Sequence, residues 1–177
     1  MGAASRGVAT AVLNHGDWAY GFRVRELRSR PGMTNMNVNF VDQHEGRMDA
    51  RDVITVGLSA EREITVTPEL TVRHFVDYMP PVFATPMMIL EMEMASGEAI
   101  HPRLPQGWVT VGTGVDIRHL QPALVGQVVR STSKVISVDQ RSIGFEVACW
   151  VGTRKIGDGK HLRGLIDVEA FTKRLMG

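Results

Sequence analysis

The spacing of apolar and polar residues predicts that the second half of the chain is built of strands. Between residues 109 and 118, apolar side chains at odd positions alternate with Thr, Gly, Asp and Arg at even positions, the period of a half-buried strand. Strands are expected at 109–118, 124–138, 143–151 and 160–168. Turns are expected at 139–141 and 152–155, with a bend at 157–159. Such short connections favour antiparallel neighbours.

The segment before these strands predicts one further strand and one buried helix. An alternating run at 61–67 indicates the strand. The helix is expected to begin at Thr85 and Pro86, because Thr is a preferred N-cap and Pro fits the first helical position. Residues 87–99 are apolar nearly all round, which is typical of a buried helix. A sheet must then wrap this helix, so the predicted fold class is α+β, with a short terminal helix at 169–175.

The first fifty residues show neither period. They hold six Arg and no Lys, together with five acidic residues. This mixed charge argues against a basic nucleic-acid-binding arm and against an Arg-rich targeting peptide. We expect residues 1–52 to be a loosely ordered N-terminal extension and residues 53–177 to form one domain.

Composition and charge exclude several classes of function. The 20 Lys and Arg nearly balance 19 Asp and Glu, which removes the electrostatic argument for a nucleic-acid partner. No run approaches the roughly 18 apolar residues of a membrane span, so no membrane association is expected. The single cysteine, Cys149, excludes a disulfide framework and fits a reducing compartment such as the cytoplasm.

No cofactor or metal is expected. The six His residues are scattered without the spacing of a metal site. The run Gly112-Thr113-Gly114 lacks the third glycine of a dinucleotide-binding loop and continues into a strand. A Gly-x-Ser-x-Gly nucleophile motif is also missing.

Glu93 is the most informative polar residue because it lies in the otherwise apolar helix. Glu91 and Glu93 are two positions apart, about 200° around a helix, so both cannot face solvent when a sheet covers the helix. Thr85, Ile89 and Glu93 follow one another at a spacing of four and share one flank. An ionisable group there costs several kcal/mol unless it is paired or neutralised. Two interpretations stay open: a salt bridge to an Arg across a subunit contact, or a functional carboxylate.

His119 and Arg163 are the other two candidates. His119 continues the odd-numbered face of Val115 and Ile117, so it is expected to point where those apolar residues point. By itself it is more simply interpreted as a satisfied core histidine. Arg163 is opposite in parity to Leu162 and, by itself, is more simply interpreted as a solvated charge on an edge strand.

Taken together, these positions carry a resemblance to a known family. The matching residues are Val82-Phe83-Ala84-Thr85-Pro86, Glu93, Gly112-Thr113, His119, Gly126, Ile156-Gly157-x-Gly159-x-His161-x-Arg163 and Glu169-x-Phe171. The sequence resembles the hotdog-fold thioesterases of the fluoroacetyl-CoA thioesterase type over about residues 55–175. The first fifty residues have no counterpart in that family.

The resemblance implies a hotdog fold, in which an antiparallel sheet wraps a long helix, and a homodimer with active sites at its interface. It implies a catalytic set of Thr85, Glu93 and His119, and contacts to an acyl-CoA substrate from Gly112, His119 and Arg163. Glu93 would attack the thioester to form an anhydride or would activate water. His119 would act as general acid and base, and Thr85 would position it or donate to the oxyanion.

Alternatives remain open for both the substrate and the class of reaction. The segment at residues 75–80 lacks the aromatic-rich character associated with fluoroacetyl selectivity, so the expected substrate is a small or medium acyl-CoA. A hotdog enoyl-CoA hydratase is one alternative, with His74 and Asp77 as the only candidates near the helix. A non-catalytic acyl-CoA sensor, with the N-terminal residues as a regulatory arm, is the other.

Overall fold

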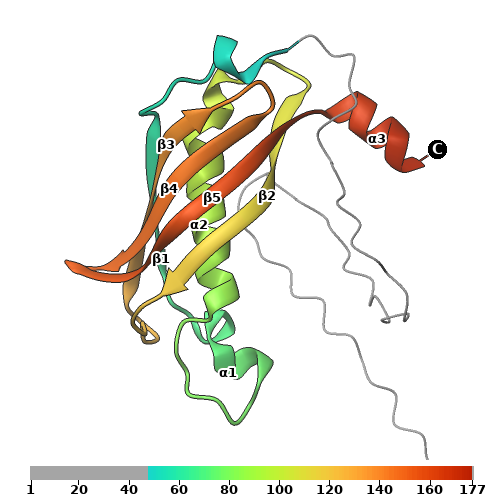
Figure 1. Ribbon diagram of the computed structural model, residues 1–177. Coiled ribbons are helices and arrows are strands. Elements are labelled where there is room, and N and C mark those ends of the chain that lie inside the picture. Colours follow the sequence, from blue (N-terminus) through green and yellow to red (C-terminus); the bar gives the residue numbers. More distant parts are fainter. Residues whose placement is uncertain (1–47, 177) are drawn as a thin grey trace, which may run out of the picture. The chain divides into compact units, whose positions relative to one another are not determined.

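Five antiparallel strands form one sheet that curves around a single long helix, α2 (Figure 1). The computed structural model describes residues 48–176, so most of the extension predicted at 1–52 lies outside the described residues. The strands are β1 (Ser59–Thr65), β2 (Trp108–His119), β3 (Val128–Val138), β4 (Ser142–Val151) and β5 (Arg154–Asp167). Their order in the sheet is β1-β3-β4-β5-β2, and every pairing is antiparallel. The predicted α+β class is confirmed.

The helices and 3-10 turns occupy the connections and the C-terminal end of the described chain. The α-helices are α1 (Val72–Phe75), α2 (Thr85–Ile100) and α3 (Val168–Met176). The 3-10 turns are η1 (Ala50–Asp52), η2 (Pro68–Leu70) and η3 (His101–Arg103). None of the helices in residues 48–176 is long and apolar enough to cross a membrane.

Helix α2 forms where its apolar run predicts, but its N-terminus differs in detail. The N-cap residue is Ala84, and no side chain caps the helix. Thr85 is instead the first helical residue and Pro86 follows it, so the predicted capping role of Thr85 is wrong. The physical reason is competition, since the Thr85 hydroxyl bonds a histidine on β2 and not the helix backbone.

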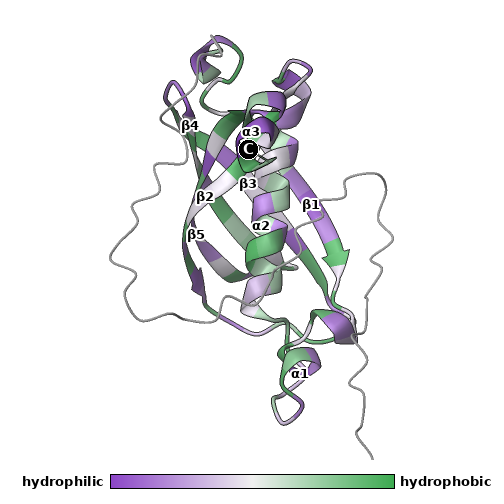
Figure 2. Ribbon diagram, turned by 90° about the vertical axis from the view of Figure 1, so that its right-hand side faces the viewer, coloured by the Kyte–Doolittle hydropathy of each residue, from purple (hydrophilic) through white to green (hydrophobic). Residues whose placement is uncertain are grey.

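The core lies between α2 and the concave face of the sheet. Met88 and Met92 of α2 are fully buried in one cluster with Phe145 and Ile156. Gly157 of β5 leaves room for the Met88 side chain, because a Cβ atom at this position would lie 2.5 Å from the Met88 sulfur. Figure 2 shows that the sheet leaves one side of α2 uncovered. Consistent with this, Leu90 on α2 remains 41% exposed.

A β-bulge interrupts strand β2. Gly112 pairs with Arg163 and Gly114 with Leu162, which leaves Thr113 as an extra residue. Even-numbered residues face α2 before the bulge, and odd-numbered residues face it afterwards. The predicted uninterrupted alternation over 109–118 is therefore wrong, because one inserted residue exchanges the two faces of a strand. The expected inward position of His119 is unaffected, since it lies beyond the bulge.

Strand β5 is longer than predicted. It begins at Arg154 and continues through residues 157–159, where a bend was expected. Gly157 and Gly159 pair with both neighbouring strands in this segment, to His119 and Ile117 on one side and to Cys149 and Val147 on the other. The two glycines therefore allow neighbouring elements, α2 and β2, to approach β5 closely. A Cβ atom at Gly159 would overlap the backbone of β2.

Candidate active site

Thr85 and His119 form a hydrogen-bonded pair between the first residue of α2 and the last residue of β2. The Thr85 Oγ1 atom lies 2.8 Å from His119 Nδ1. His119 Nε2 lies 3.1 Å from the Gln121 carbonyl oxygen, which can only accept. In the neutral ring, Nε2 therefore carries the proton and Nδ1 accepts from the Thr85 hydroxyl. A hydroxyl bonded to an imidazole that a third group orients is a common device for moving protons.

Glu93 lies two turns further along α2 and faces β5 and β2. Its Oε1 atom is 3.3 Å from Arg163 Nη1, which also donates to the Glu93 backbone carbonyl at 3.1 Å. The Glu93 side chain retains 34% exposure, so a ligand can reach it. The salt bridge that the sequence suggested across a subunit contact is thus made within the chain.

Glu91 shows where the other carboxylate of the helix goes. It is 8% exposed and accepts a hydrogen bond of 2.7 Å from Arg62 Nε on β1. Arg62 also binds Glu98. The two carboxylates therefore lie on different sides of α2, as their spacing predicts, and only Glu93 faces the β2–β5 pair.

Arg163 is buried, at 4% exposure, and every nitrogen of its guanidinium is engaged. Nε donates to Thr110 Oγ1 at 2.9 Å, Nη2 donates to the Thr110 carbonyl at 2.8 Å, and Nη1 binds Glu93. Interpreting Arg163 as a solvated edge charge is wrong for two reasons. Strand β5 lies between β4 and β2, and the exposed face of β5 belongs to Leu162.

Gly112 lies directly against the Glu93 carboxylate. A Cβ atom at this position would lie 2.7 Å from Glu93 Oε1 and 3.2 Å from His161 Cε1. Glycine is therefore required here for close approach of the β2 backbone to the carboxylate. The structure thus brings the predicted residues together in two groups, Thr85 with His119 and Glu93 with Gly112 and Arg163. Thr85 and Glu93 are about 12 Å apart along the axis of α2.

His161 is a residue of this site for which sequence reasoning predicts no role. It is 2% exposed, and its Nδ1 lies 3.0 Å from the Gly114 carbonyl while its Nε2 lies 3.3 Å from Arg163 Nη1. Burial, and next the Arg163 charge, lower the pKa of His161, opposed by Glu93 and by the bond to Gly114. Its position could have indicated this role, because it lies two residues before Arg163 and therefore on the same face of β5.

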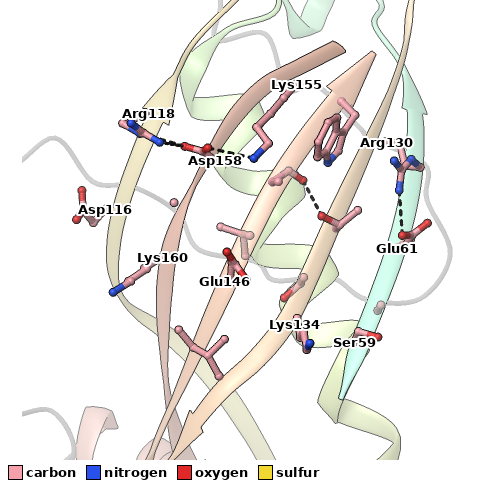
Figure 3. A pocket seen from close by; sticks show the side chains of 18 residues that line it. Ser59, Glu61, Asp116, Arg118, Arg130, Lys134, Glu146, Lys155, Asp158 and Lys160 are labelled. Atoms are coloured by element: carbon pink, nitrogen blue, oxygen red, sulfur yellow. Dashed lines mark hydrogen bonds and ion pairs between the residues drawn. The ribbon is translucent and has the colours of Figure 1, made fainter. Parts of the chain in front are cut away.

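A hollow of about 810 Å³ lies on the outer face of the sheet, away from these residues (Figure 3). Its charged side chains alternate in sign across neighbouring strands: Lys134 is opposite Glu146, Glu146 opposite Lys160, and Lys160 opposite Asp116. Asp158 binds both Arg118 and Lys155. The lining includes five Lys or Arg and four Asp or Glu side chains, so the hollow has an excess of one cation. It contains none of the predicted site residues.

Within residues 48–176, no group of three or more His, Cys, Asp or Glu side chains could hold a metal ion. The side chains of the site supply a carboxylate beside a guanidinium, and a hydroxyl–imidazole pair. Proton transfer and nucleophilic attack need groups of these kinds.

An antiparallel sheet wrapped around one long helix is the hotdog architecture, and solved structures share it. A hot-dog-like protein from Thermanaerovibrio acidaminovorans matches with a TM-score of 0.67 and 22% identity, covering 73% of this chain and 96% of that chain. The fluoroacetyl-CoA thioesterase FlK matches with a TM-score of 0.66 and 31% identity, covering 70% and 96% respectively. The fold is thus that of the hotdog-like thioesterases.

The sequence comparisons identify the family within that class. The model of the fluoroacetyl-CoA-specific thioesterase family matches residues 66–169. The fluoroacetyl-CoA thioesterase of Streptantibioticus cattleyicolor is 32% identical over 132 residues, which cover 71% of this chain and 94% of the relative. The chain belongs to the fluoroacetyl-CoA-specific thioesterase family, and the resemblance found in the sequence is confirmed.

Proposed function

We propose that this chain is an acyl-CoA thioesterase that hydrolyses a small or medium acyl-CoA to the free acid and CoA. One observation carries the proposal beyond family membership: the Glu93 carboxylate, on a largely buried helix, is held by Arg163 against Gly112 and still reaches solvent. A carboxylate kept in such a place is costly for folding and useful for catalysis.

Glu93 can act by either of two routes. As nucleophile, its oxygen attacks the thioester carbonyl, the carbon–sulfur bond breaks, and the CoA thiolate leaves and takes up a proton. Water then hydrolyses the resulting anhydride and restores Glu93. As base, Glu93 takes a proton from the water that attacks the thioester directly. Rapid acid quench followed by mass spectrometry separates the routes, because only the first gives a chain whose mass is increased by the acyl group.

His119 and Thr85 supply the remaining proton transfers; because Thr85 is about 12 Å from Glu93 along α2, this requires that the interface between two copies brings the pair to the substrate at Glu93. The Thr85 hydroxyl fixes the imidazole from the Nδ1 side, so that His119 can protonate the leaving thiolate or deprotonate water. Thr85 can instead turn its hydroxyl toward the developing oxyanion once substrate is present. Gly112 offers backbone close to the carboxylate, and with His119 and Arg163 it completes the proposed contacts to acyl-CoA.

We further propose that the protein acts as a homodimer in the cytoplasm, with its active sites at the interface. Supporting the dimer, Leu90 on α2 and Val115 on the edge strand β2 remain 41% and 53% exposed. A second copy would cover both the side of α2 that the sheet leaves open and the edge at β2, which has no further strand beside it within residues 48–176. The single, buried Cys149 is compatible with a reducing compartment.

The test is release of free CoA thiol from a panel of acyl-CoAs by wild type, Glu93→Gln and His119→Ala. We expect each variant to lose at least about 100-fold in kcat/KM, the size of effect seen when general acid–base groups are removed. Glu98→Gln, an exposed carboxylate on the same helix, is the matched control and is expected to keep wild-type activity. Wild-type kcat/KM in both Glu93→Gln and His119→Ala would contradict the assignment.

The same panel addresses the other two functions. Hydration of crotonyl-CoA without thiol release would favour an enoyl-CoA hydratase, whose candidates His74 and Asp77 are both exposed around α1. Binding of acyl-CoA without either reaction would favour a sensor. The arrangement around Glu93 supports neither of these as well as it supports hydrolysis.

A further inference from the structure

Three residues hold the Arg163 guanidinium: Thr110, Glu93 and His161. Thr110 fixes Nε and Nη2 through its hydroxyl and its carbonyl. Nη1 is shared between Glu93, at 3.1 Å from its carbonyl and 3.3 Å from its carboxylate, and His161 Nε2, at 3.3 Å. The nitrogen that binds the carboxylate is therefore also the nitrogen that contacts the histidine.

The contacts of His161 define which of its nitrogens carries the proton. The Gly114 carbonyl, 3.0 Å from Nδ1, can only accept, so Nδ1 is protonated and donates. Arg163 can only donate, so Nε2 must be the unprotonated acceptor. Only the neutral imidazole with its proton on Nδ1 satisfies both neighbours. A second proton on Nε2 would face the guanidinium directly.

The surroundings leave little freedom for any other arrangement. Phe145 of β4 lies beside the ring, with centroids 6.2 Å apart. The charged groups that face His161 are Arg163 on β5 and Glu93 on α2. His101, in the turn after α2, is also within electrostatic reach of Arg163. The low pKa of His161 agrees with the neutral form that the geometry requires.

We propose that His161 is a positioning residue: as the neutral Nδ1–H tautomer it accepts a hydrogen bond from Arg163, and so fixes the guanidinium that holds the Glu93 carboxylate in place. The inference rests on the proposed role of Glu93 in thioester hydrolysis. His161 does not touch the substrate and acts through Arg163 alone.

Two amide variants separate the two bonds of His161. In His161→Gln the amide oxygen can replace Nε2 as acceptor for Arg163, and the bond to Gly114 is lost. In His161→Asn the amide N–H can replace Nδ1 as donor to Gly114, and the bond to Arg163 is lost. Each variant loses one hydrogen bond, so both are expected to be destabilised to a similar extent.

The proposal predicts that the two variants differ in catalysis. We expect kcat for thiol release to fall about 10-fold or more in His161→Asn and less than about 3-fold in His161→Gln, with similar KM, because a misplaced reacting group is costly. Equal kcat values in the two variants would overturn the proposal, as would greater activity in His161→Asn than in His161→Gln.

A spectroscopic measurement tests the tautomer without using activity. Nitrogen-15 NMR of the full chain should show His161 with Nδ1 protonated and Nε2 unprotonated at neutral pH, and protonated Nε2 would overturn the proposal. Failure of the proposed function has a different signature, namely undiminished thiol release by Glu93→Gln. Loss of activity in Glu93→Gln together with wild-type kcat in His161→Asn would overturn the inference alone.

Discussion

The two faces of strand β5 carry charge in opposite ways. On the outer face, exposed Lys160 has Glu146 and Asp116 directly opposite it on the two neighbouring strands. On the inner face, His161 and Arg163 are 2% and 4% exposed and contact only a few defined partners. The outer charges share solvent with their neighbours, whereas each inner group needs a protein partner for every polar atom.

The difference shows what charge is used for on each face. Exposed pairs across a sheet contribute less than about 1 kcal/mol, because water screens them. A buried charge is tolerated only when it is fully paired, and removing one partner leaves the other uncompensated. The charged residues of the outer face can therefore be replaced with little loss of stability. Changes to the inner cluster of Glu93, Arg163 and His161 are expected to lower stability or activity.

The largest expected contrast is between Arg163→Met and Lys160→Met. We expect Arg163→Met to lower the free energy of unfolding by about 3–5 kcal/mol, because Glu93 and Thr110 lose their partner. Lys160→Met, three residues away on the outer face, should cost less than about 1 kcal/mol. Urea unfolding of both variants measures the difference, and equal losses would remove the distinction between the faces.

The next contrast is between two glycines that lie on either side of the bulge. Gly112→Ala places a methyl group where the Glu93 carboxylate lies, so we expect kcat/KM for thiol release to fall about 100-fold. In Gly114→Ala the added methyl group points to the outer face, where its Cβ atom would lie at an ordinary contact distance of 3.5 Å from Leu162 Cδ1. This variant should retain nearly full activity. If Gly114→Ala proved the more damaging variant, the assignment of faces around the bulge would be wrong.

A pH effect of intermediate size is expected from Cys149, a buried residue of β4. Burial raises the pKa of its thiol from 9.0 to about 11, which the bond to Ser131 partly opposes. Since the folded-state pKa is the higher one, the thiol stabilises the fold fully below pH 9. That contribution, up to about 2.7 kcal/mol, is lost as the pH rises toward 11. Unfolding measured from pH 8 to 11 should show the decline in wild type and a smaller one in Cys149→Ala.

The smallest effect is expected on the outer face itself. A double-mutant cycle with Lys134→Met and Glu146→Gln, which face each other on β3 and β4, should give a coupling below about 1 kcal/mol. That coupling should shrink further in 1 M salt, where the screening length is about 3 Å. A coupling as large as the loss in Arg163→Met would show that the outer charges are not interchangeable.

The amino-acid pattern predicts much of the fold because the strongest signals are local. The apolar run of α2 and the alternation of the strands locate that helix and the five strands, although β5 begins six residues earlier than predicted. The bulge at Thr113 is different, because the run Gly-Thr-Gly fits the alternation of apolar and polar residues in the sequence. Only the pairing of β2 with β5 shows where the two faces of the strand exchange. Local pattern cannot show register, because that is set by a partner strand about 50 residues away.

The site shows the same division. Glu93 is recognisable because a carboxylate conflicts with its apolar surroundings. Arg163 and His161 are not, since their burial depends on β2 lying outside β5 at the edge of the sheet. Local preference predicts Thr85 at the helix cap, but a contact with His119, 34 residues away, outweighs that preference. Family resemblance supplied what the residues alone could not.

The bulge in β2 has a consequence for how this chain can vary. The half of the strand before Thr113 positions backbone beside Glu93, and the half after it carries His119. The extra residue exchanges the two faces of the strand between these halves. Both halves can therefore face α2, and two parts of one site lie on a single strand. Removing Thr113 would turn one half outward and separate the two parts, whereas a residue gained or lost in a loop at either end would change neither. The length of this strand between Gly112 and His119 is therefore as constrained as the identity of the residues it carries.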